Sequence, residues 1–318
     1  MKRRKFLKQA SATAMLASAL PARSLFNFSS LSKSASSHIC IFSKHLQWLN
    51  YREMAELAAQ IGFTGIDLTV RKGGHVLPEN VRSDLPEAVE QIRAAGLEVP
   101  MITTGITDPN DPHTRDILET AGKLGIKLYR TGWYRYREGE KIADQLANAR
   151  QQMTGLQDIN KAYGIASSYQ NHAGTFIGSS GWDLLEIIEG LDPAWTGVQF
   201  DIRHAMVEGP ETWPYVLELL APYINSVDIK DFTWKVTRKA RVVNVPLGKG
   251  LIDFDLFLQK LAEFQIRADF SIHYEYPLGG AEHGATELGI SKTKFVQMVG
   301  EDLHFFKGVQ GGSSVSST

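Results

Sequence analysis

Cysteine is almost absent from the 318-residue sequence, which contains only Cys40, so no disulfide can form within the chain. The net charge of −1 leaves no basic excess of the kind that nucleic-acid binding requires. No apolar run reaches the ~20 residues that span a bilayer, and no Gly-x-Gly-x-x-Gly motif follows the first expected strand. The chain must therefore be stabilised by its hydrophobic core, and its 43% hydrophobic content is that of a globular protein.

Residues 1–37 have the pattern of an export signal followed by a linker. Arg3 and Arg4 form a twin-arginine pair, and a short, weakly apolar stretch covers 10–20. Small residues at 17–19, and Ala22 after them, are candidate cleavage positions, and residues 29–37 are rich in serine. The pattern is typical of a bacterial twin-arginine signal. We therefore expect an exported, periplasmic protein without stable membrane insertion.

The region 38–310 is predicted to be one catalytic domain, and 311–318 a disordered tail. Within this domain, helical patterns end in glycine and are followed at once by a strand pattern. Four such glycines lie roughly 30 to 40 residues apart, the length of one βα unit: Gly62, Gly96, Gly125 and Gly164. Strands are expected at 39–42, 65–70, 99–104, 127–131, 165–169, 197–201, 224–230 and 268–275, with later helices at 183–191, 213–220, 254–264 and 290–306.

Eight strands that alternate with helices predict an α/β fold, a single-domain (β/α)8 TIM barrel. An open, doubly wound sheet is the alternative. In a barrel, the active site lies at the carboxyl ends of the strands. The placement of polar residues at strand ends therefore becomes the main indication of function.

Four expected strands end in polar runs, at 168–172, 200–204, 228–231 and 273–276. Around the second run, Val198, Phe200 and Ile202 alternate with polar residues, which is a strand period. A carboxylate at the end of an apolar strand needs water, a cation or a hydrogen-bond partner, because burying it alone is too costly. Together the runs supply nitrogen and oxygen atoms sufficient for one divalent metal and a polyol: Gln170, His172, Asp201, His204, Asp228, Lys230, His273 and Glu275.

Six short runs, in this order, resemble the xylose-isomerase-like sugar isomerase and epimerase barrels over about residues 38–306: Gly65-Ile-Asp-Leu, Gln170-Asn-His, Asp201-Ile-Arg-His, Asp228-Ile-Lys-Asp, Pro246-Leu-Gly-Lys-Gly and His273-Tyr-Glu-Tyr. The resemblance implies a divalent metal held by Glu, Asp, His and Glu from strands five to eight. Here these positions are Gln170, Asp201, Asp228 and Glu275. Gln170 lacks the charge, and Asp228 changes the ligand type, so two positions depart from the family pattern.

These observations give a set of expected site residues. The expected metal ligands are Gln170, Asp201, Asp228 and Glu275, with Mn²⁺, Mg²⁺, Co²⁺ or Zn²⁺ as the metal. The expected catalytic residues are Glu275, His172, His204 and Lys230, and the expected substrate contacts are Asp67, His75, Trp133, Trp234 and His273. Two alternatives stay open: Asp228 either binds the metal or supports Lys230, and Asp201 either belongs to the site or caps the segment after it.

The sequence thus predicts a metal-dependent sugar isomerase or epimerase that removes a proton next to a carbonyl. One alternative is a dehydratase or hydratase that acts on a 3-keto-sugar, since that reaction needs only one well-placed base. The other alternative is a non-catalytic periplasmic sugar-binding barrel. An endonuclease of the same fold would need more metal-binding histidines and a basic groove. The expected partner is a small sugar, not a nucleic acid.

Overall fold

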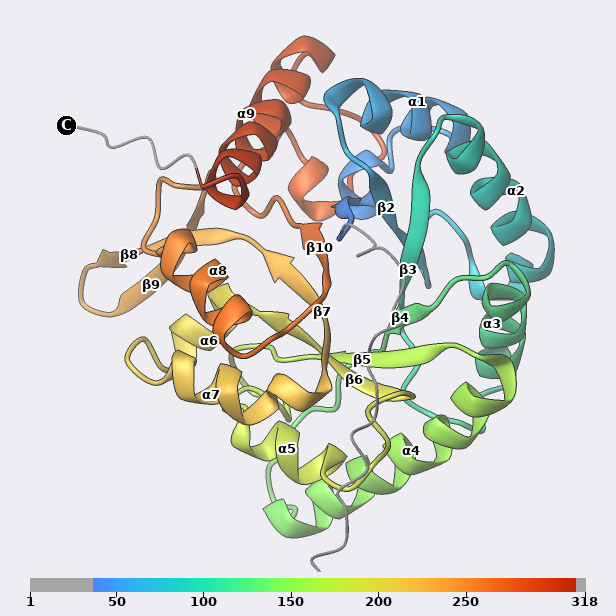
Figure 1. Ribbon diagram of the computed structural model, residues 1–318, viewed down its shortest axis with the longest axis vertical. Helices are drawn as coiled ribbons and strands as arrows, with labels where there is room; N and C mark the ends of the chain where they lie inside the picture. Colours follow the sequence, from blue (N-terminus) through green and yellow to red (C-terminus); the bar gives the residue numbers. More distant parts are fainter. Residues whose placement is uncertain (1–36, 313–318) are drawn as a thin grey trace, which may run out of the picture. The chain divides into compact units, whose positions relative to one another are not determined.

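The computed structural model describes residues 37–312. The predicted signal, the linker before residue 37 and residues 313–318 lie outside the described residues. Eight parallel strands close into a barrel in the order β1-β10-β7-β6-β5-β4-β3-β2 (Figure 1). The barrel strands are β1 (Ile39–Phe42), β2 (Gly65–Val70), β3 (Glu98–Thr104), β4 (Leu128–Arg130), β5 (Ala166–Gln170), β6 (Thr196–Asp201), β7 (Ile224–Ile229) and β10 (Asp269–Ile272). The TIM barrel is confirmed, and the doubly wound alternative is wrong.

Helices surround the barrel strands (Figure 1). They are α1 (Tyr51–Ile61), α2 (Val81–Ala94), α3 (Pro112–Lys123), α4 (Ile142–Tyr163), α5 (Trp182–Ile188), α6 (Ile202–Glu208), α7 (Trp213–Leu220), α8 (Phe254–Glu263) and α9 (Lys292–Gln310). Short 3₁₀ helices are η1 (Ser43–Leu46), η2 (Pro78–Asn80), η3 (Ala221–Tyr223) and η4 (Ala281–His283). Among residues 37–312, no helix is both long and apolar enough to cross a membrane.

The glycines that were expected to end helices do so. Gly62, Gly96, Gly125 and Gly164 all have a positive φ, between 67° and 106°. A residue with a Cβ adopts this left-handed conformation only at a cost, whereas glycine does not. The chain therefore turns out of each of these helices and enters the next strand within a few residues, which sets the βα repeat.

Two elements near the site were not predicted from the sequence. β6 ends at Asp201, as expected, but the chain continues there as a short helix, α6, which begins at Ile202. Asp201 causes this change, since its Oδ1 accepts the backbone N–H of His204 at 3.0 Å and caps the new helix. In addition, the segment after β7 forms an antiparallel hairpin, β8 (Asp231–Val236) and β9 (Ala240–Val245), which was not predicted.

The barrel interior contains a polar layer below the strand ends. Asp67 of β2 is fully buried and accepts hydrogen bonds of 2.8 Å from Thr103 and from Ser271. Since β2 and β10 are not neighbouring strands, the bond to Ser271 crosses the interior. The outer side of β10 is apolar: Phe270 packs against Phe306 of α9. Ser271 therefore faces the barrel interior, whereas Phe270 faces the surrounding helices.

Candidate active site

The polar residues at the carboxyl ends of β5, β6, β7 and β10 form one network centred on Lys230. The Lys230 Nζ lies 2.7 Å from Asp201 Oδ2 and 3.1 Å from Glu275 Oε1. Lys230 is 3% exposed and Asp201 is fully buried. Burial lowers the pKa of Lys230, but the Asp201 and Glu275 carboxylates outweigh it and raise the pKa above its ordinary value. The network is therefore held together by a charged ammonium group.

Gln170, at the end of β5, is fixed in one orientation by its neighbours. Arg130 Nη1 donates to its Oε1 at 2.8 Å, and a guanidinium can only donate. Gln170 Nε2 must therefore be the group that donates to Asp201 Oδ2 at 2.8 Å and also to Asp228 Oδ2. The side of Gln170 that faces the two carboxylates consists of N–H groups, not of lone pairs.

Asp228 and His273 form a second buried pair beside this network. His273 Nε2 lies 3.2 Å from Asp228 Oδ1, which is an ion-pair distance, but the angles do not make it a hydrogen bond. Burial raises the pKa of Asp228, and His273 opposes this effect. The His273 ring stacks on Phe42 with a centroid distance of 4.3 Å. His273 is thereby held beneath the strand ends rather than exposed at them.

Two histidines stack at the other side of Lys230. His204 and His172 have ring centroids 3.9 Å apart. Arg203 Nη1 lies 2.8 Å from His204 Nδ1, and Lys230 Nζ lies 3.2 Å from His204 Nε2. Both cations can only donate, so the neutral ring accepts a hydrogen bond from one of them. Burial, together with the Lys230 charge, lowers the pKa of His204 far below its ordinary value.

His172 is the neutral histidine with an available lone pair. The His172 Nδ1 lies 2.9 Å from the carbonyl oxygen of Ala173, which can only accept, so Nδ1 carries the proton and Nε2 the lone pair. Burial and then Lys230 lower the pKa of His172 to about 4. The ring is half-buried against Trp133 and Phe176. His172 can therefore accept a hydrogen bond or a proton without first losing one.

Glu275 differs from the other carboxylates because a substrate can reach it. Its side chain is 25% exposed, whereas Asp67, Asp201 and Asp228 are fully buried. Burial alone would raise the pKa of Glu275, but Lys230, with other cations, holds it well below its ordinary range. Asn244 Nδ2, from the hairpin, also approaches Glu275 Oε2 at 3.4 Å. Glu275 is thus an ionised, oriented carboxylate at the surface of the network.

Of the residues expected to contact substrate, Asp67 and His75 are engaged in contacts within the protein, Trp133 lies at the site, and Trp234 lies on the hairpin. Asp67 has both oxygens occupied within the barrel, so it supports the layer beneath the site. His75 contacts the backbone oxygen of Leu46 at 3.2 Å and the Thr69 hydroxyl at 3.3 Å, and so organises its own loop. Trp133 lies against His172. Trp234 lies on the hairpin against Phe232, with ring centroids 5.6 Å apart.

Basic residues at the site were missed as site residues. Arg130 ends β4, Arg71 directly follows β2, and Lys44 lies in η1 directly after β1. All three could have been found by applying the strand-end rule to basic residues as well as to carboxylates. Asn244 was missed because it depends on the hairpin, which the sequence prediction did not contain.

The side chains at the predicted metal positions do not fit a divalent metal. Gln170 turns its N–H groups toward Asp201 and Asp228, and N–H groups cannot coordinate a cation. Asp201 and Glu275 already accept from the Lys230 ammonium, which a metal would have to displace. Within residues 37–312, no three His, Cys, Asp or Glu residues are arranged to hold a metal.

Asp201 has both of the roles that the sequence left open. Its Oδ1 caps α6, and its Oδ2 belongs to the site, where it contacts Lys230.

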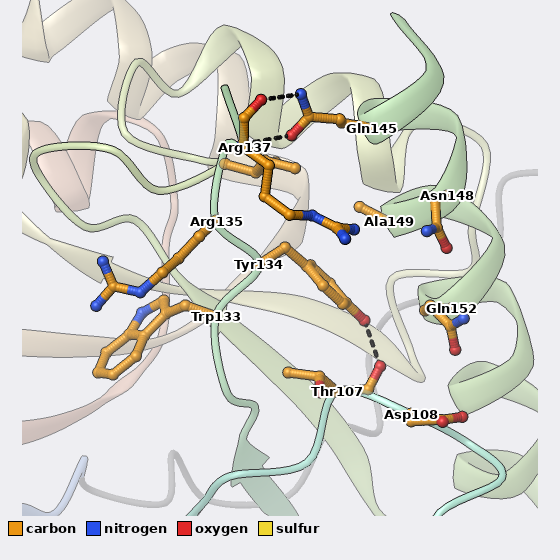
Figure 2. A pocket seen from close by; sticks show the side chains of 11 residues that line it. Thr107, Asp108, Trp133, Tyr134, Arg135, Arg137, Gln145, Asn148, Ala149 and Gln152 are labelled. Atoms are coloured by element: carbon orange, nitrogen blue, oxygen red, sulfur yellow. Dashed lines mark hydrogen bonds between the residues drawn. The ribbon is translucent and has the colours of Figure 1, made fainter. Parts of the chain in front are cut away.

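A cavity of about 470 Å³ lies beside this site, between the segment after β4 and α4. Figure 2 shows Tyr134 and Arg137 on the side of α4, with the Tyr134 hydroxyl bonded to the Thr107 carbonyl oxygen, while Trp133 and Arg135 lie on the other side of the segment. Trp133 directs its ring toward Arg130 and His172. Trp133 borders both the cavity and the site, but Lys230, Asp201 and Glu275 do not line the cavity, and we assign the chemistry to the network that they form.

Comparisons with known proteins agree with the barrel fold. A family model described as xylose isomerase-like TIM barrel matches residues 55–292. No curated protein sequence matches the chain. Three similar solved structures are an IOLI protein with a bound zinc atom (17% identity, TM-score 0.65, covering 85% of this chain and 98% of the other), the 3-keto-D-glucoside 4-epimerase of E. coli (14%, 0.62, 85% and 99%), and the probable 3-DHS dehydratase of petrobactin synthesis from Bacillus anthracis (13%, 0.61, 85% and 98%). At these identities the similarity establishes the fold.

Proposed function

The chain belongs to the xylose isomerase-like TIM barrel family, and from that premise we propose that it is a sugar isomerase or epimerase that moves a proton on the carbon next to a carbonyl. The observation that carries the proposal is Glu275, the exposed carboxylate of an otherwise buried network. A carbon acid of this kind needs a base within reach and a positive charge near the oxygen that becomes an enolate. Glu275 and Lys230 supply these two groups side by side.

Glu275 is the proposed base. The nearby Lys230 keeps it ionised at neutral pH, which is the form that can accept a proton. Asn244 and Lys230 together fix the direction of its oxygens. His172 Nε2, which has a lone pair, is the proposed partner that accepts a hydrogen bond from a substrate hydroxyl or exchanges a proton with it.

Lys230 is the proposed electrostatic group. Two of its three N–H groups are directed to Asp201 and Glu275, and the third lies toward His204 Nε2 at 3.2 Å. This third N–H is the one proposed to turn to the developing enolate oxygen when substrate is bound. Because this ammonium already occupies the carboxylates that a metal would need, no step is assigned to a divalent metal. The sequence-based prediction of a metal-dependent reaction is replaced by one in which a fixed lysine provides the positive charge.

The test is deuterium exchange from solvent into a panel of keto-sugars, followed by NMR. Incorporation at one carbon together with a new stereoisomer or constitutional isomer is the expected result, and Glu275→Gln should abolish both. Binding of sugars without exchange by the wild-type protein would instead identify the non-catalytic sugar-binding barrel that the sequence left open.

A dehydratase acting on a 3-keto-sugar is the second candidate, and Gln170 specifically favours it. A reaction with two carboxylate bases would need an ionisable group at the strand-five position, and an amide cannot take the proton. Elimination needs one base for the carbon-bound proton and an acid for the leaving hydroxyl. The same NMR experiment separates the candidates, because elimination produces an unsaturated ketone and water, whereas isomerisation conserves the formula.

We also propose that the protein is exported through its twin-arginine segment, which lies outside the described residues. Replacing both Arg3 and Arg4 by Lys keeps the charge and removes the recognition pattern. Folded precursor should then accumulate inside the cell, as measured by fractionation and mass spectrometry of the amino terminus. Unchanged export and processing of this variant would refute the proposal.

A further inference from the structure

The strands on the other side of the barrel place three cations around one aromatic ring. Lys44 Nζ lies 5.6 Å from the centroid of the Phe42 ring, and the guanidinium carbons of Arg71 and Arg130 lie 5.5 and 5.8 Å from it. These residues follow or end β1, β2 and β4. Among residues 37–312, no carboxylate forms an ion pair with any of these three cations, and Asp67 of β2, in the same half of the site, is bonded to Thr103 and Ser271.

Lys44 and Arg71 make no side-chain hydrogen bond or ion pair with any residue in 37–312. The two nearest candidates for pairing are already engaged: Asp67 accepts from two hydroxyl groups, and Glu275 accepts from Lys230. Arg130 also has no carboxylate within 4 Å in this part of the chain. Burial and then the like charge of Arg71 lower the pKa of Arg130 to about 10, against the opposing charges of Asp228, Asp67 and Asp201.

Arg130 is nevertheless held firmly in place. It is 4% exposed, its Nη1 donates to Gln170 at 2.8 Å, and its guanidinium lies 4.4 Å from the centre of the Trp133 ring. Its Nε is buried without a hydrogen-bond partner among residues 37–312. Its Nη2 has no partner there either, although it is not enclosed. A rigid guanidinium with a free N–H edge is suited to binding a planar carboxylate or a phosphate.

The charge balance of the whole site points the same way. The cations are Lys44, Arg71, Arg130, Arg203 and Lys230, and the carboxylates are Asp67, Asp201, Asp228 and Glu275. The excess is positive, and it lies on the side of β1, β2 and β4, away from the Lys230 network. Buried or half-buried like charges repel one another unless an anion lies among them.

From these contacts we propose that Lys44, Arg71 and Arg130 bind an anionic substituent of the sugar substrate, a carboxylate or a phosphate. The proposal rests on the proposed function, because it assigns the substrate class of the same site. It places the anionic group on the β1–β4 side and the reacting carbon near Glu275 and Lys230. The predicted substrates are thus sugar acids or sugar phosphates rather than neutral sugars.

The test compares three ligands with the same ring that differ at C6: D-glucose, D-glucuronate and D-glucose 6-phosphate. Calorimetric titration of the full chain is expected to show at least ~10-fold tighter binding of one charged sugar than of glucose, since charge-assisted hydrogen bonds are the strong ones. The preferred sugar tells carboxylate from phosphate. Arg71→Gln and Lys44→Met should each remove most of this preference, and Arg71→Lys should retain part of it. Equal affinity for all three ligands would overturn the proposal.

Arg82→Gln is the matched control, because it removes the same charge from an exposed residue that pairs with Asp116 between α2 and α3. It should leave the preference unchanged, and circular dichroism should show that every variant is folded. Retention of the full preference in a Lys44→Met and Arg71→Gln double variant would also overturn the proposal. Because binding is measured without turnover, and also in Glu275→Gln, a charged-sugar preference without proton exchange would refute only the proposed reaction.

Discussion

The two halves of the strand-end site treat charge in opposite ways. On the side of β5, β6, β7 and β10, each charged group is engaged, with Lys230 joined to Asp201 and Glu275. On the side of β1, β2 and β4, Lys44 and Arg71 face the Phe42 ring and contact no carboxylate among the described residues. The first half is complete without a ligand, whereas the second half has donors for which the described chain provides no acceptor. We infer that the first half performs the chemistry and that the second half recognises the substrate.

We call the side of β5, β6, β7 and β10 the paired half, and the side of β1, β2 and β4 the unpaired half. The largest expected effect comes from removing the charge of Glu275, the exposed carboxylate of the paired half. Glu275→Gln keeps size and hydrogen bonding but removes the charge, so turnover should fall by at least ~100-fold, as it does when a key charged group is lost at a transition state. Because Glu275 is 25% exposed, the melting temperature should change little. Steady-state kinetics and calorimetry measure these two quantities.

Asp201→Asn provides the contrast within the same half. Asp201 is buried, caps α6 and pairs with Lys230, so its loss should reduce both turnover and stability. Leaving a buried ammonium without its partner typically costs ~3–5 kcal/mol. The two substitutions should be non-additive in turnover, since both act on one network. Normal turnover in Glu275→Gln would move the chemistry to His172, His204 and Lys230.

The next prediction concerns metal binding: it tests whether Gln170, Asp228 and Lys230 are the residues that keep a metal out of the paired half. Combining Gln170→Glu, Asp228→His and Lys230→Met replaces the amide and the ammonium and produces the Glu-Asp-His-Glu set of the family pattern. This variant should bind Mn²⁺ or Co²⁺ at least ~10-fold more tightly than the wild type, because ligand identity decides metal affinity. Turnover of the wild type should be unaffected by dialysis against a chelator. Loss of wild-type activity on chelation, restored by added Mn²⁺, would contradict the lysine-centred proposal.

The sequence predicted the barrel because two local signals agree with the global fold. Glycine ends the helices, and apolar strands follow at a regular spacing, so strand bounds such as Ile39–Phe42 and Gly65–Val70 were predicted correctly. The end of the sixth strand at Asp201 was also predicted, but the helix α6 that follows it was not, because its start depends on the cap that Asp201 forms. Strand ends gave the composition of the site. They did not give the pairing, because the sequence alone does not show whether Asp228 binds a metal or accepts from Gln170, nor which carboxylates Lys230 meets.

A smaller effect is expected in the unpaired half, where the affinity for a charged sugar should depend on pH through Lys44. Burial lowers the pKa of Lys44, Glu275 opposes this effect, and Lys230, Arg71 and Arg130 add to it, so that the pKa lies at about 8. Lys44 therefore loses its proton as the pH rises through about 8, and the affinity for the preferred charged sugar should fall several-fold between pH 7 and 9. Lys44→Met should bind more weakly at pH 7 and show a flatter profile. An identical fall in both proteins would assign the titration to another group.

The smallest expected effect concerns the support behind the paired half. Asp302 of α9 is 3% exposed, accepts the N–H of Leu247 at 3.2 Å, and accepts the Tyr276 hydroxyl at 3.0 Å. These contacts fasten α9 to the chain after the hairpin, which carries Asn244, and to the chain just beyond Glu275. Asp302 is therefore bonded to segments next to the charged network, but it contacts none of the charged residues of the network itself.

Burial raises the pKa of Asp302 to about 7, above its value of ~3.9 in an unfolded chain. Between these values the folded state binds more protons than the unfolded state, so the free energy of unfolding should decrease as the pH rises from about 4 to 7. The wild-type melting temperature should therefore fall by a few degrees between pH 5 and pH 8, since ~1 kcal/mol shifts it by ~2–4 °C in a domain of this size. Asp302→Asn keeps an acceptor for Leu247 and cannot ionise, so its profile should be flatter while turnover stays that of the wild type. If turnover falls with the melting temperature, the rigidity of the paired half depends on α9; if only stability changes, the Lys230 network holds its geometry alone.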